Sequence, residues 1–311
     1  MRAMAATRAG LAFGAAASLL LANRALAWRE ERPAVAGAGR LVPTAAGEMH
    51  VLEEGDPAAP PAVLLHGFAG SMHWFDRFAP LLAPEHRVVR IDLLGHGGSA
   101  KPLGDYSIER QAEAVDGVLR ALGVEDALFV GHSFGGAVSV AVAERSPSLV
   151  GRLVVLDEGP DNGYGSTSLL TRIGFVPVVG ELVHRIAFDA GIRDGYADAF
   201  AEGFDLSGEV GDQTVRDYRA MTYPSYASSW DAEERYLAET QLQERLRRLA
   251  IPALVVFGEQ DAFFDAESSA EAFRAVPGLR VEVLPGVGHS PIVERPDAVA
   301  QLVREHVAAP A

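Results

Sequence analysis

Apolar positions along this chain change their spacing from one segment to the next. Short apolar runs and one stretch of partial period two predict strands at residues 49–55, 62–67, 87–95, 127–133, 152–157, 252–259 and 280–286. Helical stretches lie between most of them, at 71–82, 107–121, 134–146, 266–276 and 291–308. Continuous apolar strands that alternate with helices predict a mostly parallel, doubly wound α/β sheet that is covered on both faces.

The alternation stops for 93 residues between Asp157 and Ile251. This interval is too long for a structureless connection in a compact domain. Apolar residues recur inside it at helical spacing, at Val179, Leu182, Val183 and Ile186, and again at Leu242, Leu246 and Leu249. We therefore predict a helical cap over residues 158–246, inserted into a core made of residues 40–157 and 247–311.

The N-terminal segment has a composition of its own. Two arginines precede an uncharged run at residues 9–23, and the small-x-small triplet at 25–27 precedes Trp28. This order is typical of a secretory signal peptide. The run is shorter than the roughly 20 apolar residues of a membrane span, but counting to Trp28 reaches that length. We therefore predict that residues 1–39 form a signal peptide or a membrane anchor, followed by a linker. An anchor would tether the protein to the membrane through residues 9–28. The protein is thus predicted to be exported or membrane-anchored. An alanine-rich helix packed on a cytoplasmic protein is the remaining alternative.

Charge and composition narrow the partners and cofactors. The chain has 27 basic and 42 acidic residues, a net charge of −15, and no cysteine. Such an acidic surface repels phosphate backbones, so we expect no nucleic-acid partner. Disulfides and cysteine metal sites are excluded, and the sequence has no metal-ligand cluster or dinucleotide-binding fingerprint. We therefore expect no metal and no cofactor.

One hydroxyl lies in a glycine-rich turn. Residues 131–136 read GHSFGG, after an apolar strand and before a helix of small residues. A nucleophile on a strand-to-helix turn has a strained backbone, so the residues two before and two after it must lack bulky Cβ substituents. The N–H groups at the start of that helix would face negative charge that develops on a substrate. Ser133 is therefore the candidate nucleophile, and a tight packing turn is the alternative.

This arrangement resembles the α/β-hydrolase family. The segment LLHGFAGS matches the family's His-Gly stretch after the third strand, and DLLGHGGSAKP matches its turn after the fourth strand. The resemblance implies that the backbone N–H groups of Phe68 and Phe134 form an oxyanion hole. It also implies that His66 is a structural turn residue and that His96, at a variable position of its turn, faces solvent.

The same resemblance suggests the remaining catalytic groups. His289 lies in GVGHSPIVERP, the Gly-His turn that delivers the family's catalytic base, and Asp261 lies in VVFGEQDAFF, the family's acid motif. The order Ser, Asp, His is that of α/β hydrolases. Asp157, at the end of an earlier strand, is an alternative acid, whereas Glu259 is expected to face elsewhere.

A Ser-His-Asp triad with an oxyanion hole implies acyl transfer to water. We predict an esterase for a small-molecule, ester-like and fairly apolar substrate. Trp74, Tyr223, Tyr226 and Trp230 are candidate pocket residues, or else they pack the cap onto the core. Carbon–carbon bond hydrolase, lactonase and thioesterase activities remain open, as does a catalytically silent ligand-binding module, although such modules usually lose a triad residue.

Overall fold

The computed structural model describes residues 38–165, 174–176 and 178–310. The predicted signal or anchor segment lies outside these residues, apart from its last two positions. In the described ranges, no helix is long and apolar enough to cross a bilayer.

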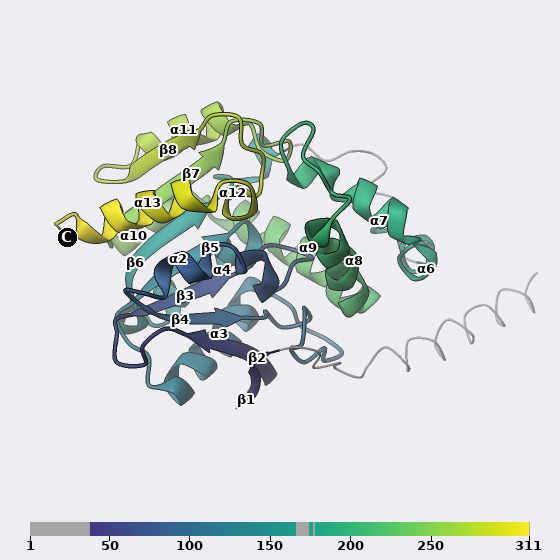
Figure 1. Ribbon diagram of the computed structural model, residues 1–311, viewed down its shortest axis with the longest axis horizontal. Coiled ribbons are helices and arrows are strands. Elements are labelled where there is room, and N and C mark those ends of the chain that lie inside the picture. The colour runs from purple at the N-terminus through teal and green to yellow at the C-terminus, as the bar shows by residue number, and fades with distance from the viewer. Residues whose placement is uncertain (1–37, 166–173, 177, 311) are drawn as a thin grey trace, which may run out of the picture.

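A single sheet of eight strands forms the centre of the molecule (Figure 1). The strands are β1 (Arg40–Thr44), β2 (Gly47–Glu54), β3 (Pro61–Leu65), β4 (Arg87–Ile91), β5 (Ala127–His132), β6 (Val150–Leu156), β7 (Ala253–Gly258) and β8 (Arg280–Leu284). Their order is β1-β2-β4-β3-β5-β6-β7-β8. β1 pairs antiparallel with β2, and β2 with β4. The other pairs, which join β4, β3, β5, β6, β7 and β8 in that order, are parallel, and this confirms the predicted mostly parallel sheet.

Helices cover both faces of this sheet, as predicted. One face packs against α3 (Ile108–Leu122), α4 (Phe134–Arg145), α10 (Leu242–Leu249) and α11 (Ala266–Arg274). The other packs against η1 (Met72–Phe75), α2 (Ala79–Leu82), α12 (Pro291–Glu294) and α13 (Pro296–Ala308). Alternate residues of β3 supply the two cores, Val63 and Leu65 to the first and Ala62 and Leu64 to the second. This is the period of two that a strand with two buried faces requires.

Two helices predicted as continuous are divided at prolines. The expected helix at 71–82 is split into η1 and α2, and the expected helix at 291–308 is split into α12 and α13. Pro80 and Pro296 each stand in the first turn of the second piece, where the missing N–H group costs nothing. β1 was not predicted, because it is a five-residue edge strand that contains Pro43.

Most of the long interval after β6 forms short helices that gather on one side of the molecule (Figure 1). They are η3 (Asn162–Tyr164), α6 (Val179–Ile186), α7 (Asp189–Gly195), η4 (Ala197–Ala199), α8 (Glu209–Ala220) and α9 (Tyr223–Glu239). The short helix η2 (Pro147–Leu149) precedes β6. Helix α10 begins inside the predicted cap range, but its Leu242 and Leu246 pack in the core on the sheet face that α3 and α4 cover.

Candidate active site

Ser133 lies at the turn from β5 into α4 with a strained backbone. Its φ of 49° and ψ of −125° place a non-glycine residue at positive φ, and its amide donates to Leu156 O at 2.7 Å. A Cβ atom at Gly131 would come within 2.3 Å of Gly135 O, and one at Gly135 within 2.2 Å of Leu65 O. The predicted need for small residues on either side of the serine is therefore confirmed.

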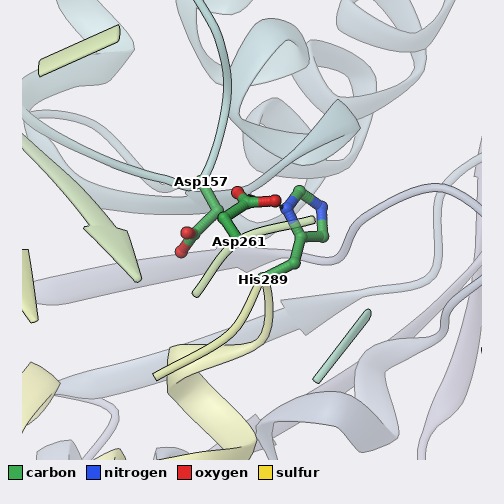
Figure 2. Close-up of side chains that lie close together, drawn as sticks. All are labelled: Asp157, Asp261 and His289. Atoms are coloured by element: carbon green, nitrogen blue, oxygen red, sulfur yellow. Dashed lines mark hydrogen bonds and ion pairs between the residues drawn. The ribbon is translucent and has the colours of Figure 1, made fainter. Parts of the chain in front are cut away.

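The predicted base and acid are hydrogen-bonded to each other. His289 Nδ1 lies 2.8 Å from Asp261 Oδ2, and the Asp261 side chain is fully buried (Figure 2). The other carboxylate oxygen accepts the amides of Phe263 and Phe264, at 2.7 and 3.1 Å. Because a carboxylate can only accept, Nδ1 carries a proton and Nε2 is the ring nitrogen that remains for chemistry.

His132 holds the His289 loop against the serine turn. Its Nε2 donates to the carbonyl oxygen of His289 at 2.6 Å, and the two rings lie 5.1 Å apart. Burial, and then the nearby His289, lower the pKa of His132 to about 3, so its ring is neutral and has one proton to donate. In the described part of the chain, no hydrogen bond joins Ser133 Oγ to His289. Contact between the hydroxyl and Nε2 therefore stays a prediction. Catalytic hydrogen bonds of this kind often form only when substrate binds.

Asp157 lies next to Asp261 (Figure 2). It is fully buried at a φ of 48°, and one of its oxygens accepts the amide of Gly258 at 2.7 Å. Burial, and then the negative charge of Asp261, raise the pKa of Asp157 well above its usual range. A protonated Asp157 can donate to Asp261. Glu259 points elsewhere and accepts the amide of Gly286.

Two carboxylates and an imidazole can also ligate a divalent cation. The ligand atoms of Asp157, Asp261 and His289 all lie within 4.8 Å of one another. However, His289 Nδ1 carries the proton that bonds to Asp261 Oδ2, so this nitrogen has no lone pair for a cation. The geometry fits an oriented imidazole better than a metal site.

The His-Gly segment after β3 approaches the serine closely. A Cβ atom at Gly67 would lie 3.2 Å from Ser133 Cβ. Phe134 is the first residue of α4, where N–H groups lack a helical partner. Within residues 38–165, 174–176 and 178–310, the amides of Phe68 and Phe134 donate no hydrogen bond. Two unpartnered N–H groups thus flank the serine turn.

Of the two histidines in the predicted turns, His66 agrees with the expectation from the sequence and His96 does not. His66 is structural as expected, since its Nδ1 donates to Gly67 O and its Nε2 accepts the amide of Leu93. The prediction that His96 faces solvent is wrong, because its side chain is fully buried. Gly95, at a φ of 88°, helps fold this turn inward, and the ring of His96 packs 5.9 Å from that of Phe134. Burial lowers the pKa of His96 to about 3.

Aromatic residues of α9 lie over the oxyanion segment. The ring of Phe68 lies 4.9 Å from that of Tyr226 and 5.5 Å from that of Trp230. Phe175 stacks on both residues, at 5.3 and 4.9 Å. Tyr223 and Tyr226 both pack against His184 of the cap, but among the described residues Tyr223 has no ring contact with Phe68. Two of the predicted pocket residues therefore reach the serine side of the cap.

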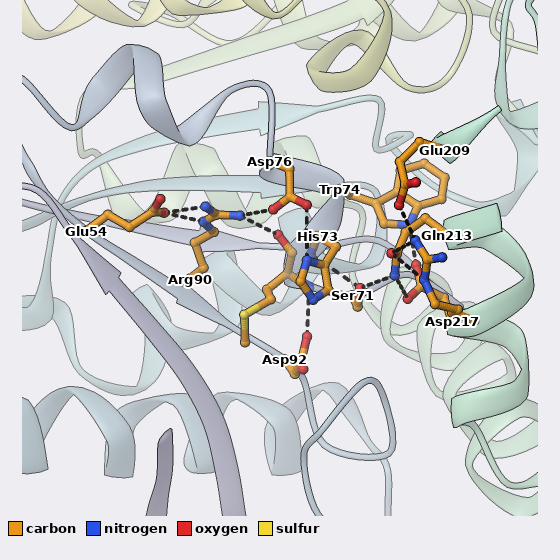
Figure 3. Close-up of polar contacts among 12 residues, drawn as sticks. Glu54, Ser71, His73, Trp74, Asp76, Arg90, Asp92, Glu209, Gln213 and Asp217 are labelled. Carbon is orange, nitrogen blue, oxygen red and sulfur yellow. Dashed lines mark hydrogen bonds and ion pairs between the residues drawn. The ribbon is translucent and has the colours of Figure 1, made fainter. Parts of the chain in front are cut away.

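Trp74 joins the core to cap helix α8 (Figure 3). Its Nε1 donates to Asp217 Oδ2 at 2.8 Å, and its ring stacks 5.9 Å from that of His132. Gln213 donates to the other oxygen of Asp217 at 2.6 Å. Burial nevertheless raises the pKa of Asp217 to about 7. Sequence reasoning missed His132 and Asp217, because nothing in their local sequence indicates partners 157 and 143 residues away.

Comparison with known proteins adds sequence and structural relatives. A family model described as alpha/beta hydrolase fold matches residues 60–296. Lipase 1 of Psychrobacter immobilis is 29% identical over 275 residues, which cover 81% of this chain and 78% of the lipase. The 2-(acetamidomethylene)succinate hydrolase of Mesorhizobium japonicum is 28% identical over 243 residues, which cover 78% of this chain and 84% of that enzyme.

Solved structures of the same fold cover most of this chain. The carboxylesterase CesB of Bacillus subtilis has a TM-score of 0.70 at 21% identity and covers 94% of this chain and 100% of its own. The enol-lactonase of Burkholderia xenovorans has a TM-score of 0.74 at 23% identity and covers 87% of this chain and 100% of its own. At these identities the likeness is one of fold.

Proposed function

Because the chain belongs to the α/β-hydrolase fold family and is a hydrolase, we propose that it cleaves carboxylic esters of small to medium, fairly apolar substrates. Ser133 is the nucleophile, His289 the base and Asp261 the orienting acid. The observation that carries this proposal is the 2.8 Å hydrogen bond between His289 and Asp261, held beside the strained Ser133 turn by His132.

In the first half-reaction, Ser133 Oγ attacks the ester carbonyl carbon while His289 Nε2 takes up the hydroxyl proton. The charged imidazolium is stabilised by Asp261, whose other oxygen is fixed by two backbone amides. The carbonyl oxygen becomes an oxyanion that the amides of Phe68 and Phe134 stabilise, and each such donor typically contributes about 3 kcal/mol. The imidazolium then protonates the leaving alcohol, and the acyl group remains on Ser133.

In the second half-reaction, His289 Nε2 takes a proton from water, which attacks the acyl carbon. The same two amides stabilise the second oxyanion, and its collapse returns the proton to Ser133 and releases the acid. Every proton lost by the serine or the water is held by one nitrogen, so no further acid or base is needed. Tyr226 and Trp230, which lie over Phe68, would contact the substrate and favour an apolar group there.

A panel of para-nitrophenyl esters, from acetate to long acyl chains, tests the proposal. We expect turnover that Ser133→Ala abolishes, and labelling of Ser133 by a fluorophosphonate probe, because both require an activated serine. Glu234→Gln, a change on the exposed side of α9, is the control and should hydrolyse esters as the wild type does. Absence of both turnover and labelling would support the ligand-binding module instead.

A further inference from the structure

One stretch of the cap is packed into the core. Residues 196–202, which we call the bridging segment, lie between α7 and α8 and contain η4. Ala199 and Phe200 are buried in the same apolar cluster as residues of α12 and α13. The Phe200 ring stacks 5.7 Å from that of Trp74, which in turn stacks on His132. The bridging segment is therefore joined to the core next to the proposed active site.

The first residue of the bridging segment bonds to the loop that holds a proposed oxyanion donor. The Tyr196 hydroxyl donates to the carbonyl oxygen of Ala69 at 2.6 Å. Ala69 follows Phe68 directly and has a φ of 52°, an uncommon conformation for a residue other than glycine. Such a strained residue keeps its conformation only where its surroundings fix it. The Tyr196 hydroxyl thus helps to hold the strained residue next to Phe68.

The other end of the bridging segment shares a carboxylate with the His289 loop. Glu294, the last residue of α12, accepts the amide of Ala201 at 3.0 Å. The same carboxylate accepts the amides of Gly288 at 3.1 Å and Ser290 at 3.3 Å, on either side of His289. Hydrogen bonds from amides to a carboxylate are charge-assisted and stronger than those between neutral groups. Glu294 thus joins the cap to the backbone on both sides of the proposed base.

Two further contacts connect the bridging segment to the loops of the base and the acid. A Cβ atom at Gly288 would lie 2.2 Å from the amide nitrogen of Ala201, so the two backbones touch. Gln260, next to Asp261, accepts the amide of Glu202 at 3.2 Å. Closely packed interiors transmit a displacement instead of absorbing it. A shift of the bridging segment would therefore also shift these loops.

The sheet itself connects the oxyanion loop and the His289 loop only indirectly. The first loop follows β3 and the second follows β8, and β5, β6 and β7 lie between these two strands. Ester hydrolysis requires the oxyanion donors and the imidazole in fixed relative positions, and a misplacement of about 1 Å can lower a rate about 10²-fold. The bridging segment provides a second, shorter connection between the two loops.

We propose that the bridging segment positions the active site, because Tyr196 and Glu294 tie the oxyanion loop and the His289 loop to one and the same stretch of the cap. Tyr196 and Glu294 are then positioning residues, which act on the reaction through Phe68 and His289. The inference rests on the proposed ester hydrolysis and adds residues to its mechanism. It assigns this part of the cap an effect on kcat, whereas a cap that only encloses the substrate affects KM.

The first test removes single hydrogen-bonding groups. Tyr196→Phe removes only the hydroxyl, and Glu294→Gln replaces one acceptor oxygen by an amide group that cannot accept. We expect each change to lower kcat for para-nitrophenyl acetate by about tenfold or more and to change KM by less than about twofold, because the reacting geometry is affected and the binding of this small ester is not.

Matched control variants lose the same kinds of hydrogen bond elsewhere. The Tyr106 hydroxyl also donates to a backbone carbonyl, that of Pro102, at 2.6 Å. The Asp265 carboxylate also accepts a backbone amide, that of Ser268, at 2.8 Å. Tyr106→Phe and Asp265→Asn should therefore leave both kcat and KM unchanged.

Two readouts separate positioning from other roles. Fluorophosphonate labelling carried to completion counts the folded sites that contain Ser133, so kcat is expressed per labelled site and a loss of folded enzyme does not enter it. If the bridging segment only contacted substrate, KM would rise more for long acyl chains than for acetate. Positioning instead lowers kcat by a similar factor for every ester.

The double variant tests whether the two residues act through one segment. Tyr196→Phe combined with Glu294→Gln should lower kcat by less than the product of the two single losses, because either change already loosens the connection between the loops. Losses that multiply would mean that the two residues act independently, which contradicts the inference.

The outcomes also separate this inference from the proposed function. If either single variant keeps the wild-type kcat per labelled site, or if only KM rises, the bridging segment does not position the two loops. The esterase proposal stands in that case, provided that Ser133→Ala abolishes turnover. If the wild type neither hydrolyses the esters nor reacts with the probe, the ester mechanism is wrong and the inference falls with it.

Discussion

Two sets of buried carboxyls differ in what contacts them: Asp261 in the loop after β7, and the pair formed by Glu158 after β6 and Glu233 on cap helix α9. Asp261 accepts two backbone amides and an imidazole. Glu158 and Glu233 contact each other, and within the described residues no amide or cation bonds to their buried oxygens.

The difference separates a carboxylate oriented by hydrogen-bond donors from carboxyls that burial keeps protonated. Local backbone amides fix Asp261, so its geometry does not depend on what is bound. Glu158 and Glu233 come from segments 75 positions apart, and burial raises the pKa of both. Asp157, beside Asp261, resembles this pair, since burial raises its pKa as well.

The largest expected effect tests whether the core groups act as a unit. Ser133→Ala and His289→Ala should each lower kcat for a good para-nitrophenyl ester by about 10⁴-fold or more, because neither group activates the reaction alone. The double variant should lose little more than either single variant, measured under single-turnover and steady-state conditions. Multiplicative losses would mean that the two residues act independently.

A second comparison tests which carboxylate orients the imidazole. Asp261→Asn should lower kcat by roughly 10³- to 10⁴-fold, because it replaces the acceptor that fixes the His289 tautomer. Asp157→Asn, an equally isosteric change, should lower kcat by less than about tenfold, since its amide can still donate to Asp261 as the protonated acid does. A larger loss in Asp157→Asn would transfer the role of the acid to Asp157.

The smallest effect concerns the junction between Trp74 and cap helix α8. The folded state raises the pKa of Asp217 from 3.8 to about 7, so it binds more protons than the unfolded state between those values. The contribution of Asp217 to stability is therefore present below about pH 4 and is lost as the pH rises to about 7, by at most a few kcal/mol. Melting temperatures should show Asp217→Asn gaining on the wild type over that range.

Asp198→Asn, an exposed change in the cap, provides the control for this measurement. Its melting temperature should follow that of the wild type at every pH. If Asp217→Asn also follows the wild type, Asp217 does not titrate between those values, and the junction does not respond to pH.

Sequence patterns predicted the parts of the molecule that depend on local chemistry. Short apolar runs and one stretch of partial period two predicted seven of the eight strands, including all six parallel ones, and the glycines around Ser133 predicted its strained turn. The Gly-His and Gly-x-x-Asp segments led to His289 and Asp261, which the fold joins by a hydrogen bond. Pro80 and Pro296 indicate where two predicted helices are divided, but the spacing of apolar residues alone predicted continuous helices there.

Burial in a tertiary contact was beyond the reach of those patterns. His96 has a polar, glycine-rich surrounding in the sequence, yet it packs beneath Phe68 and Phe134. The position of Glu158, directly after a strand that ends at the site, indicated that it could lie near the site. Nothing in the local sequence indicated this for Glu233. Their meeting depends on how the cap packs on the core.

The sequence by itself determined which residues stand at strand ends and turns, because strand periodicity, glycine conformations and proline geometry act over a few neighbouring residues. Only the tertiary structure decided which side chains lost water and which charges came together, because desolvation and Coulomb interactions depend on distance in space. For this hydrolase, the orientation of His289 by Asp261 and the contact between the buried carboxyls of Glu158 and Glu233 both come from that second level.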